Sequence, residues 1–356
     1  MGPVVTDRSH LPTDRSPALA RSRRSLAGDR TTAPLHSRVP RRRSVTIRRL
    51  TAPGLVAALS LAVIVVTPAA PVPAQTKLVM AFVPSVEAQT ILESGNRIAH
   101  LLEMATGYHF DSFVATSYAG VIEAMGARRA DIGWLNTFSY VIAHEKYGVE
   151  VRLVTVRFGT PYYRAEIITQ ATSGINSLAD LKGKRFAFVD PASTSGYLFP
   201  LAGLKKAGYD PAQFFGQAIF AGSHNNVVLA VYQGRVDAGA VYEDARATVQ
   251  KTLPDIMQKV KVVWKSDPIP NDTVSFRRDL PADVKDRVAK ALLRFSELPP
   301  GLDALKSALE IEALADYPLL VTKYKINVPS LDAFYDPVRD VARYAGINLE
   351  DLIKPR

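Results

Sequence analysis

The 356-residue sequence contains no cysteine. Disulfide bonds, thiolate nucleophiles and cysteine-based metal sites are therefore excluded. A lipid anchor attached to a cysteine behind an export signal is excluded as well. Whatever holds the fold together must come from its apolar core, which the 47% content of hydrophobic residues can supply.

Beyond its first 74 residues the chain has almost no net charge. The formal net charge is +10, but residues 1–50 hold twelve arginines against three aspartates, and residues 51–74 hold no charged side chain. The remaining 282 residues carry 32 basic and 31 acidic side chains. A nucleic-acid-binding surface needs a basic stripe, so no nucleic acid is expected as a partner.

Motifs of the common enzyme classes are missing from residues 75–356. The four histidines there, His100, His109, His144 and His224, lack metal-ligand spacing such as His-Glu-x-x-His. There is no Gly-x-Ser-x-Gly elbow and no phosphate-binding Gly-x-x-x-x-Gly-Lys loop. We therefore expect a protein that is not an enzyme and has neither a metal nor a cofactor.

The N-terminal region has the order of a secretory signal. A basic stretch, residues 41–49, precedes the 13-residue apolar run 54–66, and small residues with prolines follow up to Ala74. This order predicts a leader over residues 1–74 that is cleaved near Ala74-Gln75. A membrane anchor is the alternative, but a bilayer span needs about 20 apolar residues.

The length of the basic extension before this signal is unusual. An alternative is that translation begins near Val39 or Val45. Export with no cysteine available for lipidation predicts a soluble periplasmic protein rather than a lipoprotein.

From Lys77 on, apolar strands alternate with helical segments, as in α/β folds. Strands are expected at residues 77–84, 111–115, 130–135, 151–156, 165–169, 185–189, 218–221, 237–242 and 261–264. The sequence predicts two lobes, one of residues 75–160 plus 270–356 and one of residues 161–269. Two crossings would then form a hinge, with a ligand cleft at the carboxyl ends of the strands.

The clearest local signal is the loop Asp190-Pro191-Ala192-Ser193-Thr194-Ser195-Gly196, between a predicted strand and a predicted helix. A helix N-terminus offers unpaired N–H groups and a positive dipole end, and three hydroxyls add donors. This combination suits a tetrahedral oxyanion. The alternative is an ordinary helix cap, for which one hydroxyl suffices.

Five further polar residues are candidates for the same ligand. His224, in a second loop between a strand and a helix, could donate to an anion, most strongly when protonated. Tyr118 and Tyr162 offer phenol donors, while Asp272 and Asp244 could accept a P–OH hydrogen or hold an ammonium group. Their alternatives are a satisfied loop histidine, packing tyrosines and solvated turn carboxylates.

These motifs together resemble the phosphate-, phosphite- and phosphonate-binding proteins of ABC transporters. The resemblance extends over nearly all of residues 77–300. It rests on Tyr118-Ala119-Gly120-Val121-Ile122-Glu123-Ala124-Met125, Asp131-Ile132-Gly133-Trp134-Leu135, Asp190-Pro191-Ala192-Ser193-Thr194-Ser195-Gly196, Gly222-Ser223-His224 and Trp264-Lys265-Ser266-Asp267-Pro268-Ile269-Pro270-Asn271-Asp272.

The resemblance implies a two-lobed periplasmic binding protein of type II, with an oxyanion pocket and no catalytic site. That pocket falls on Tyr118, Tyr162, Ser193, Thr194, Ser195 and His224, and the carboxylates that hold an ammonium in aminophosphonate binders fall on Asp272 and Asp244. The segment 241–244 lacks the amides expected for that branch and looks more like the phosphite or phosphate branch.

The implied role is capture of a small phosphorus oxyanion by a monomer that docks on a membrane permease with its ATPase. Because no Arg or Lys lies in the loop 190–196, we expect capture by neutral donors rather than by an arginine clamp. The alternative function is a ligand-sensing module of the same fold that partners a membrane signalling kinase.

Overall fold

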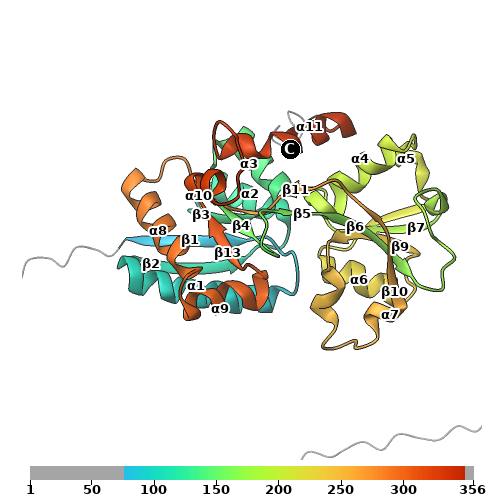
Figure 1. Cartoon of the computed structure of the whole chain (residues 1–356), viewed down its shortest axis with the longest axis horizontal. Helices are drawn as coiled ribbons and strands as arrows, with labels where there is room; N and C mark the ends of the chain where they lie inside the picture. The colour runs from blue at the N-terminus through green and yellow to red at the C-terminus, as the bar shows by residue number, and fades with distance from the viewer. Residues whose placement is uncertain (1–75, 349–356) are drawn as a thin grey trace, which may run out of the picture. The chain divides into compact units, whose positions relative to one another are not determined.

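The computed structural model describes residues 76–348 (Figure 1). The predicted leader, residues 1–74, and its cleavage site at Ala74-Gln75 lie outside these residues. Within 76–348 no helix combines the length and apolar character that crossing a membrane requires. The same range holds no group of three or more His, Asp or Glu side chains that could bind a metal ion.

A six-stranded sheet forms the core of the first lobe. Its order is β13 (Ala313–Ala315), β4 (Glu150–Val156), β12 (Thr273–Phe276), β3 (Ile132–Leu135), β1 (Lys77–Phe82) and β2 (His109–Val114). β1 is parallel to β2 and β3, whereas β12 is antiparallel to both of its neighbours. The chain after residue 270 therefore returns to complete the sheet that begins at Lys77.

Helices cover both faces of this sheet because its strands are apolar on both sides. Leu78, Met80 and Phe82 of β1 point to one face, and Ala81 points to the other. The first face packs against α1 (Ala88–Thr106), α8 (Ala282–Phe295) and α9 (Pro299–Leu309). The second packs against α2 (Tyr118–Gly126) and α3 (Thr137–Tyr147).

A five-stranded sheet forms the second lobe. Its order is β10 (Val260–Lys265), β6 (Ala165–Gln170), β9 (Ala238–Tyr242), β7 (Arg185–Phe188) and β8 (Gln217–Phe220). β7 is parallel to β8 and β9, whereas β6, which follows the first crossing, is antiparallel to β9. One face is covered by α4 (Phe199–Lys206) and α5 (Pro211–Phe214), the other by α6 (His224–Tyr232).

Two short strands carry the chain between the two sheets. β5 (Tyr162–Tyr163) pairs antiparallel with β11 (Ile269–Pro270), with Ile269 opposite Tyr163. This ribbon lies where the two crossings were expected. The boundaries of the lobes at residues 160 and 270 stay predictions, because strand pairing fixes only which segments build each sheet.

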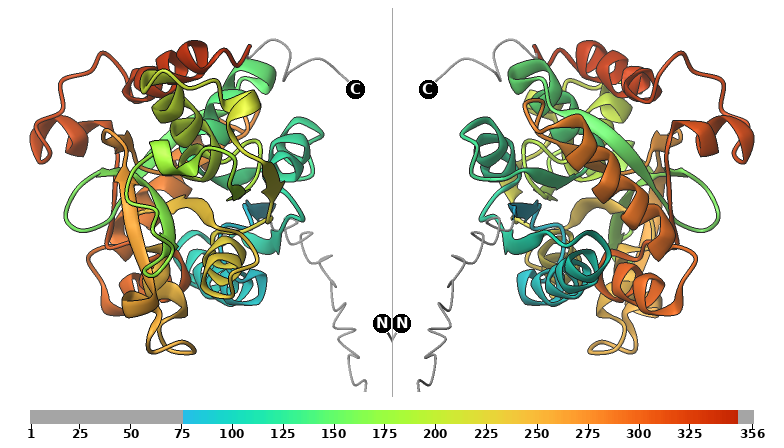
Figure 2. Two further views of the ribbon diagram at one scale, coloured as in Figure 1. Left: turned by 90° about the vertical axis from the view of Figure 1, so that its right-hand side faces the viewer. Right: turned by 90° about the vertical axis from the view of Figure 1, so that its left-hand side faces the viewer.

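The C-terminal part adds a contact between the lobes. α11 (Asp336–Ala345) packs on α3 and on α4 and is the last helix of the described chain (Figure 2). The remaining elements are α7 (Ile256–Lys259), α10 (Tyr317–Thr322), the 3-10 turns η1 (Ala179–Leu181), η3 (Ala245–Val249) and η4 (Asp332–Tyr335), and the π-helix η2 (Thr194–Leu198).

The predicted type II fold is confirmed by these two sheets. Nine expected strands are present within a few residues of their predicted positions. β12 and β13 were not expected. β13 has three residues, which is too short for an alternating pattern, and its Ala-Leu-Ala has no residue of high β-propensity.

Candidate anion-binding site

Three buried hydroxyl residues open the π-helix η2. Ser193 has an extended backbone and caps the helix, its Oγ accepting from the Gly196 N–H at 3.1 Å. The Leu198 N–H donates to the Ser193 carbonyl at 3.1 Å, which gives the wide π turn that is common at functional sites. Ser193, Thr194 and Ser195 are 1%, 0% and 3% exposed, so solvent does not satisfy their hydroxyls.

Gly196 allows this loop to close. A Cβ there would lie 2.3 Å from Val189 Cγ2 and 2.9 Å from Ser193 Oγ. We expect Gly196→Ala to displace the start of η2 and to lower the free energy of unfolding by about 1–3 kcal/mol, as urea unfolding would measure. Gly120→Ala is the control, since its Cβ would meet nothing closer than 3.3 Å. Equal stability of the two variants would contradict this role of Gly196.

Thr194 joins the two lobes. Its Oγ1 lies 2.8 Å from each of three donors at the N-terminus of α3, namely Asn136 Nδ2, Thr137 Oγ1 and the Phe138 N–H. One hydroxyl has one hydrogen and two lone pairs. These donors fill both lone pairs, so in this conformation Thr194 acts as a latch between the lobes.

We therefore expect Thr194→Val to weaken ligand binding by about 1–3 kcal/mol, because it leaves buried donors of α3 unpaired in the closed conformation. Asn136→Ala should weaken binding through the same contact. Calorimetry of the single and double variants measures the coupling, and an interaction above about 0.5 kcal/mol is expected. Strictly additive effects would contradict the latch.

Tyrosine hydroxyls flank the two serines. Tyr118, the first residue of α2, is 1% exposed, and its Oη makes no well-aligned hydrogen bond within the described residues. Burial raises its pKa, the charges of Asp190 and Asp272 raise it further, and the neighbouring Ser193 hydroxyl opposes them. Tyr118 is therefore a neutral phenol close to Ser193 with a hydrogen to donate.

The tyrosine of β5 that lies beside the serines is Tyr163, the neighbour of the predicted Tyr162. Burial raises the pKa of Tyr163, while the Ser195 and Thr194 hydroxyls beside it act to lower that pKa. Tyr162 instead packs edge-on against Phe334, with 5.2 Å between ring centroids. Adjacent residues of a strand point to opposite faces, so only one tyrosine of β5 can face the serines.

Asp190 holds the loop against the first lobe. Its Oδ1 accepts from the Ala192 N–H at 2.8 Å, and its Oδ2 accepts from the Tyr118 N–H at 3.4 Å. Burial raises the pKa of this carboxyl, and the two N–H groups act to lower it. Asp190 thus occupies the N-terminus of α2 and aligns Tyr118 with Ser193.

His224 is buried, and its surroundings favour the neutral form. Burial lowers its pKa to about 3, and the Arg157 charge contributes. Its Nδ1 lies 3.1 Å from the Tyr242 N–H and accepts from it, so Nε2 carries the hydrogen. The His224 N–H donates to the Ser85 carbonyl of the first lobe at 2.9 Å.

The two predicted carboxylates have different surroundings. Asp272 lies within range of Tyr118 and Tyr163, raising the pKa of both. Asp244 has a left-handed backbone, φ 64°, ahead of η3, and its charge acts on Glu166. Asp272 is therefore brought to the site, whereas no contact in the described chain joins Asp244 to the site.

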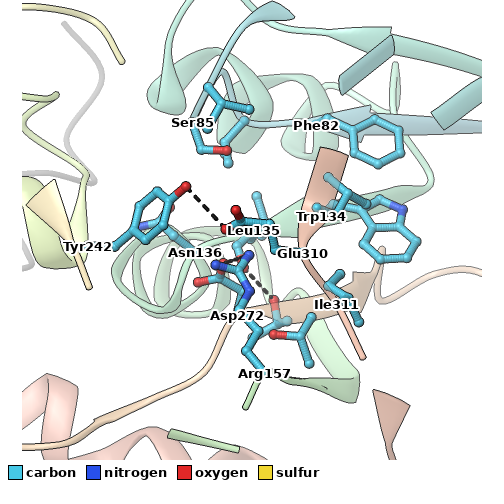
Figure 3. A pocket seen from close by; sticks show the side chains of 15 residues that line it. Phe82, Ser85, Trp134, Leu135, Asn136, Arg157, Tyr242, Asp272, Glu310 and Ile311 are labelled. Atoms are coloured by element: carbon cyan, nitrogen blue, oxygen red, sulfur yellow. Dashed lines mark hydrogen bonds and ion pairs between the residues drawn. The ribbon is translucent and has the colours of Figure 1, made fainter. Parts of the chain in front are cut away.

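A small cavity of about 50 Å³ is lined in part by Asn136, whose amide bonds to Thr194 (Figure 3). One wall is apolar, with Phe82 stacked on Trp134 at 5.5 Å. The polar residues that line it include Asn136, Thr155, Arg157, Tyr242, Asp272 and Glu310. Several of their atoms are buried without a partner among the described residues: Asn136 Oδ1, Thr155 Oγ1, Arg157 Nε and Asp272 Oδ1.

Arg157 was not expected, and it changes the electrostatics of the site. Its Nη2 lies 3.4 Å from Asp272 Oδ2, and its guanidinium lies 5.7 Å from the centre of the Tyr242 ring. The expectation that only neutral donors would surround the ligand is therefore incomplete, because a guanidinium lines the cavity as well. Sequence reasoning missed Arg157, because it lies in neither of the two polar loops.

Comparison with known proteins identifies relatives of this chain. A family model described as "ABC transporter, phosphonate, periplasmic substrate-binding protein" matches residues 80–316. The phosphate-import protein PhnD of Mycolicibacterium smegmatis is 30% identical over 286 residues, which covers 76% of this chain and 86% of the relative. The phosphonates-binding periplasmic protein of Escherichia coli is 28% identical over 255 residues, covering 70% and 74%.

Solved structures share the fold. A binding-protein component of a phosphonate ABC transporter from Pseudomonas aeruginosa aligns with a TM-score of 0.63 at 24% identity, covering 78% of this chain and 98% of the other. PhnD1 of Prochlorococcus marinus, in complex with methylphosphonate, aligns with a TM-score of 0.66 at 17% identity, covering 77% and 99%.

Proposed function

We propose that this chain captures a phosphorus oxyanion for import. The premise is that the chain belongs to the family of periplasmic substrate-binding proteins of phosphonate ABC transporters. The family consists of transport proteins and not of enzymes. The ligand is therefore expected to be released unchanged to a membrane permease with its ATPase.

The observation that carries this proposal is the burial of three consecutive hydroxyl residues, Ser193 to Ser195, at a helix start. A buried hydroxyl without a partner is costly, and Tyr118 Oη is one among the described residues. The hydroxyls of Ser193, Ser195 and Tyr163 are further possible donors. The N–H groups of the first turn of η2 add the positive end of the helix. An oxyanion with several acceptor oxygens would satisfy these donors.

The buried acceptor oxygens of the cavity favour a ligand with a hydrogen-bond donor. Asp272 Oδ1 and Asn136 Oδ1 are buried acceptors that receive no hydrogen bond from residues 76–348. The P–OH group of a protonated phosphorus oxyanion could donate to either one. Sulfate has no hydrogen to donate at neutral pH, so it would leave these buried acceptors without a donor, which disfavours it.

Closure of the lobes would complete the site. Asn136 and Tyr118 come from the first lobe, whereas the serines come from the second, so only the closed conformation has both sets. A ligand that contacts both lobes shifts the equilibrium toward this conformation. The β5–β11 ribbon is the proposed hinge, since it carries both crossings.

Calorimetric titration of the purified protein tests the proposal. Phosphate, phosphite, hypophosphite, methylphosphonate and 2-aminoethylphosphonate form the panel, with sulfate as the matched control. We expect binding of at least one phosphorus oxyanion and none of sulfate. No heat with any member of the panel, or equal affinity for sulfate, would contradict the proposed function.

A further inference from the structure

Arg157 is held in the cavity by the fold of the first crossing. It follows β4 directly, and a tight turn locks its backbone, with the Arg157 N–H donating to the Thr160 carbonyl at 3.1 Å and the Thr160 N–H donating back at 3.0 Å. Phe158 and Gly159 supply the left-handed turn, with φ 51° and 70°. The side chain of Arg157 is only 15% exposed, so it is directed inward and not into solvent.

The pair of Arg157 with Asp272 leaves hydrogen-bonding groups unused. A single contact of 3.4 Å joins them, longer than the roughly 2.7–2.9 Å of a good charge-assisted bond. Arg157 Nε and Asp272 Oδ1 remain buried without partners in the described chain. A buried ion pair with unmet groups contributes little to stability, which indicates that these groups serve a ligand.

Arg157 is the one cationic side chain among the described residues that line the cavity. Two carboxylates share its charge. Asp272 is in direct contact with it, and Glu310, which accepts from Tyr242 Oη at 3.3 Å, lies close enough to act on it. A cationic group on a ligand that approached Asp272 would therefore meet a carboxylate already paired with Arg157, and beside it the fixed like charge of that guanidinium.

We propose that Arg157 is the specificity-determining residue of the cavity. Its guanidinium occupies the place that a ligand's cationic group would take beside Asp272. The cavity therefore accepts phosphorus oxyanions without a basic substituent and rejects those that carry an amine. This inference rests on the proposed function, because it needs an oxyanion bound at Ser193 and Ser195. The negative charge of that oxyanion is attracted by the same guanidinium.

The test compares two ligands in matched variants. Calorimetry at neutral pH would measure the affinities of inorganic phosphate, or of the tightest amine-free ligand of the panel, and of 2-aminoethylphosphonate. Arg157→Gln removes the charge at similar length. Arg152→Gln is the control, because Arg152 lies on β4, the strand that Arg157 follows, and pairs with Asp286 outside the cavity.

The wild-type protein should prefer the amine-free ligand by at least about tenfold, because the ammonium group of the other ligand meets the like charge of Arg157. In Arg157→Gln this ratio should fall by at least about tenfold, and in Arg152→Gln it should stay unchanged. Arg157→Lys, which keeps the charge, should keep the preference. Thermal unfolding would establish that each variant is folded.

Two results would overturn the role of Arg157 while leaving the proposed function intact. One is wild-type protein that binds 2-aminoethylphosphonate at least as tightly as the amine-free ligands. The other is an unchanged ratio in folded Arg157→Gln, or equal ratios in Arg157→Lys and Arg157→Gln. Wild-type protein that binds no phosphorus oxyanion would instead contradict the proposed function itself.

Discussion

Replacing Ser193 and Ser195 together by alanine should weaken binding of the tightest oxyanion by roughly 10²- to 10⁴-fold, since each hydrogen bond to a charged group contributes about 1.5–3 kcal/mol. Ser193 Oγ already accepts from Gly196 N–H, so its own hydrogen is available to an anion. Ser195 is buried beside Tyr163, and its hydroxyl is the second donor. Calorimetry measures the loss.

Part of any effect at Ser193 is loss of a helix cap, which costs about 1 kcal/mol of stability. Ser330→Ala is the matched control, because Ser330 Oγ also accepts a backbone N–H, from Ala333 at 3.1 Å, and is exposed. Binding by this control should equal that of the wild type. A double variant that is folded and binds with wild-type affinity would place the ligand elsewhere.

Lowering the pH from 7 to 5 should cost roughly 2 kcal/mol of the free energy of unfolding through His224 alone. The folded protein keeps this histidine neutral, with a pKa of about 3, whereas in the unfolded chain its pKa is near 6.5. Below pH 6.5 the unfolded state therefore binds a proton that the folded state does not. The free energy of unfolding therefore decreases as the pH is lowered below 6.5, until the pH reaches the folded-state pKa of His224.

Urea unfolding at pH 7, 6 and 5 measures this dependence. His224→Gln should flatten it, while the exposed His100→Gln should keep the wild-type slope. Asp190 and Asp272 act in the opposite sense, because burial raises the pKa of both and their protonation favours the folded state. The comparison between variants therefore isolates His224, and equal slopes in His224→Gln and the wild type would refute its neutral burial.

The sequence was sufficient for the α/β pattern and for the polar loops at the ends of strands. Ser193 to Ser195 could be singled out because three hydroxyls exceed the needs of a cap. Tyr118 could be found from its place beside a capping serine. These features are local, so a short stretch of sequence contains the information.

The residues that sequence reasoning missed depend on the meeting of distant segments. The choice between Tyr162 and Tyr163 depends on which face of a two-residue strand turns toward the serines. Asn136 bonds to Thr194, 58 positions away, and Arg157 pairs with Asp272, 115 positions away. Neither pairing leaves a periodic trace in the sequence. The burial that keeps His224 neutral is likewise a property of the packed lobes.

A crystal structure of the protein with its tightest oxyanion tests the central claim most directly. The account predicts that the phosphorus oxyanion lies between the lobes, with its oxygens about 2.5–3.0 Å from the hydroxyl oxygens of Ser193, Ser195 and Tyr118. It also predicts that Asp272 lies next to the ligand. An anion bound at another site, with the Ser193 and Ser195 hydroxyls turned away from it, would contradict the account.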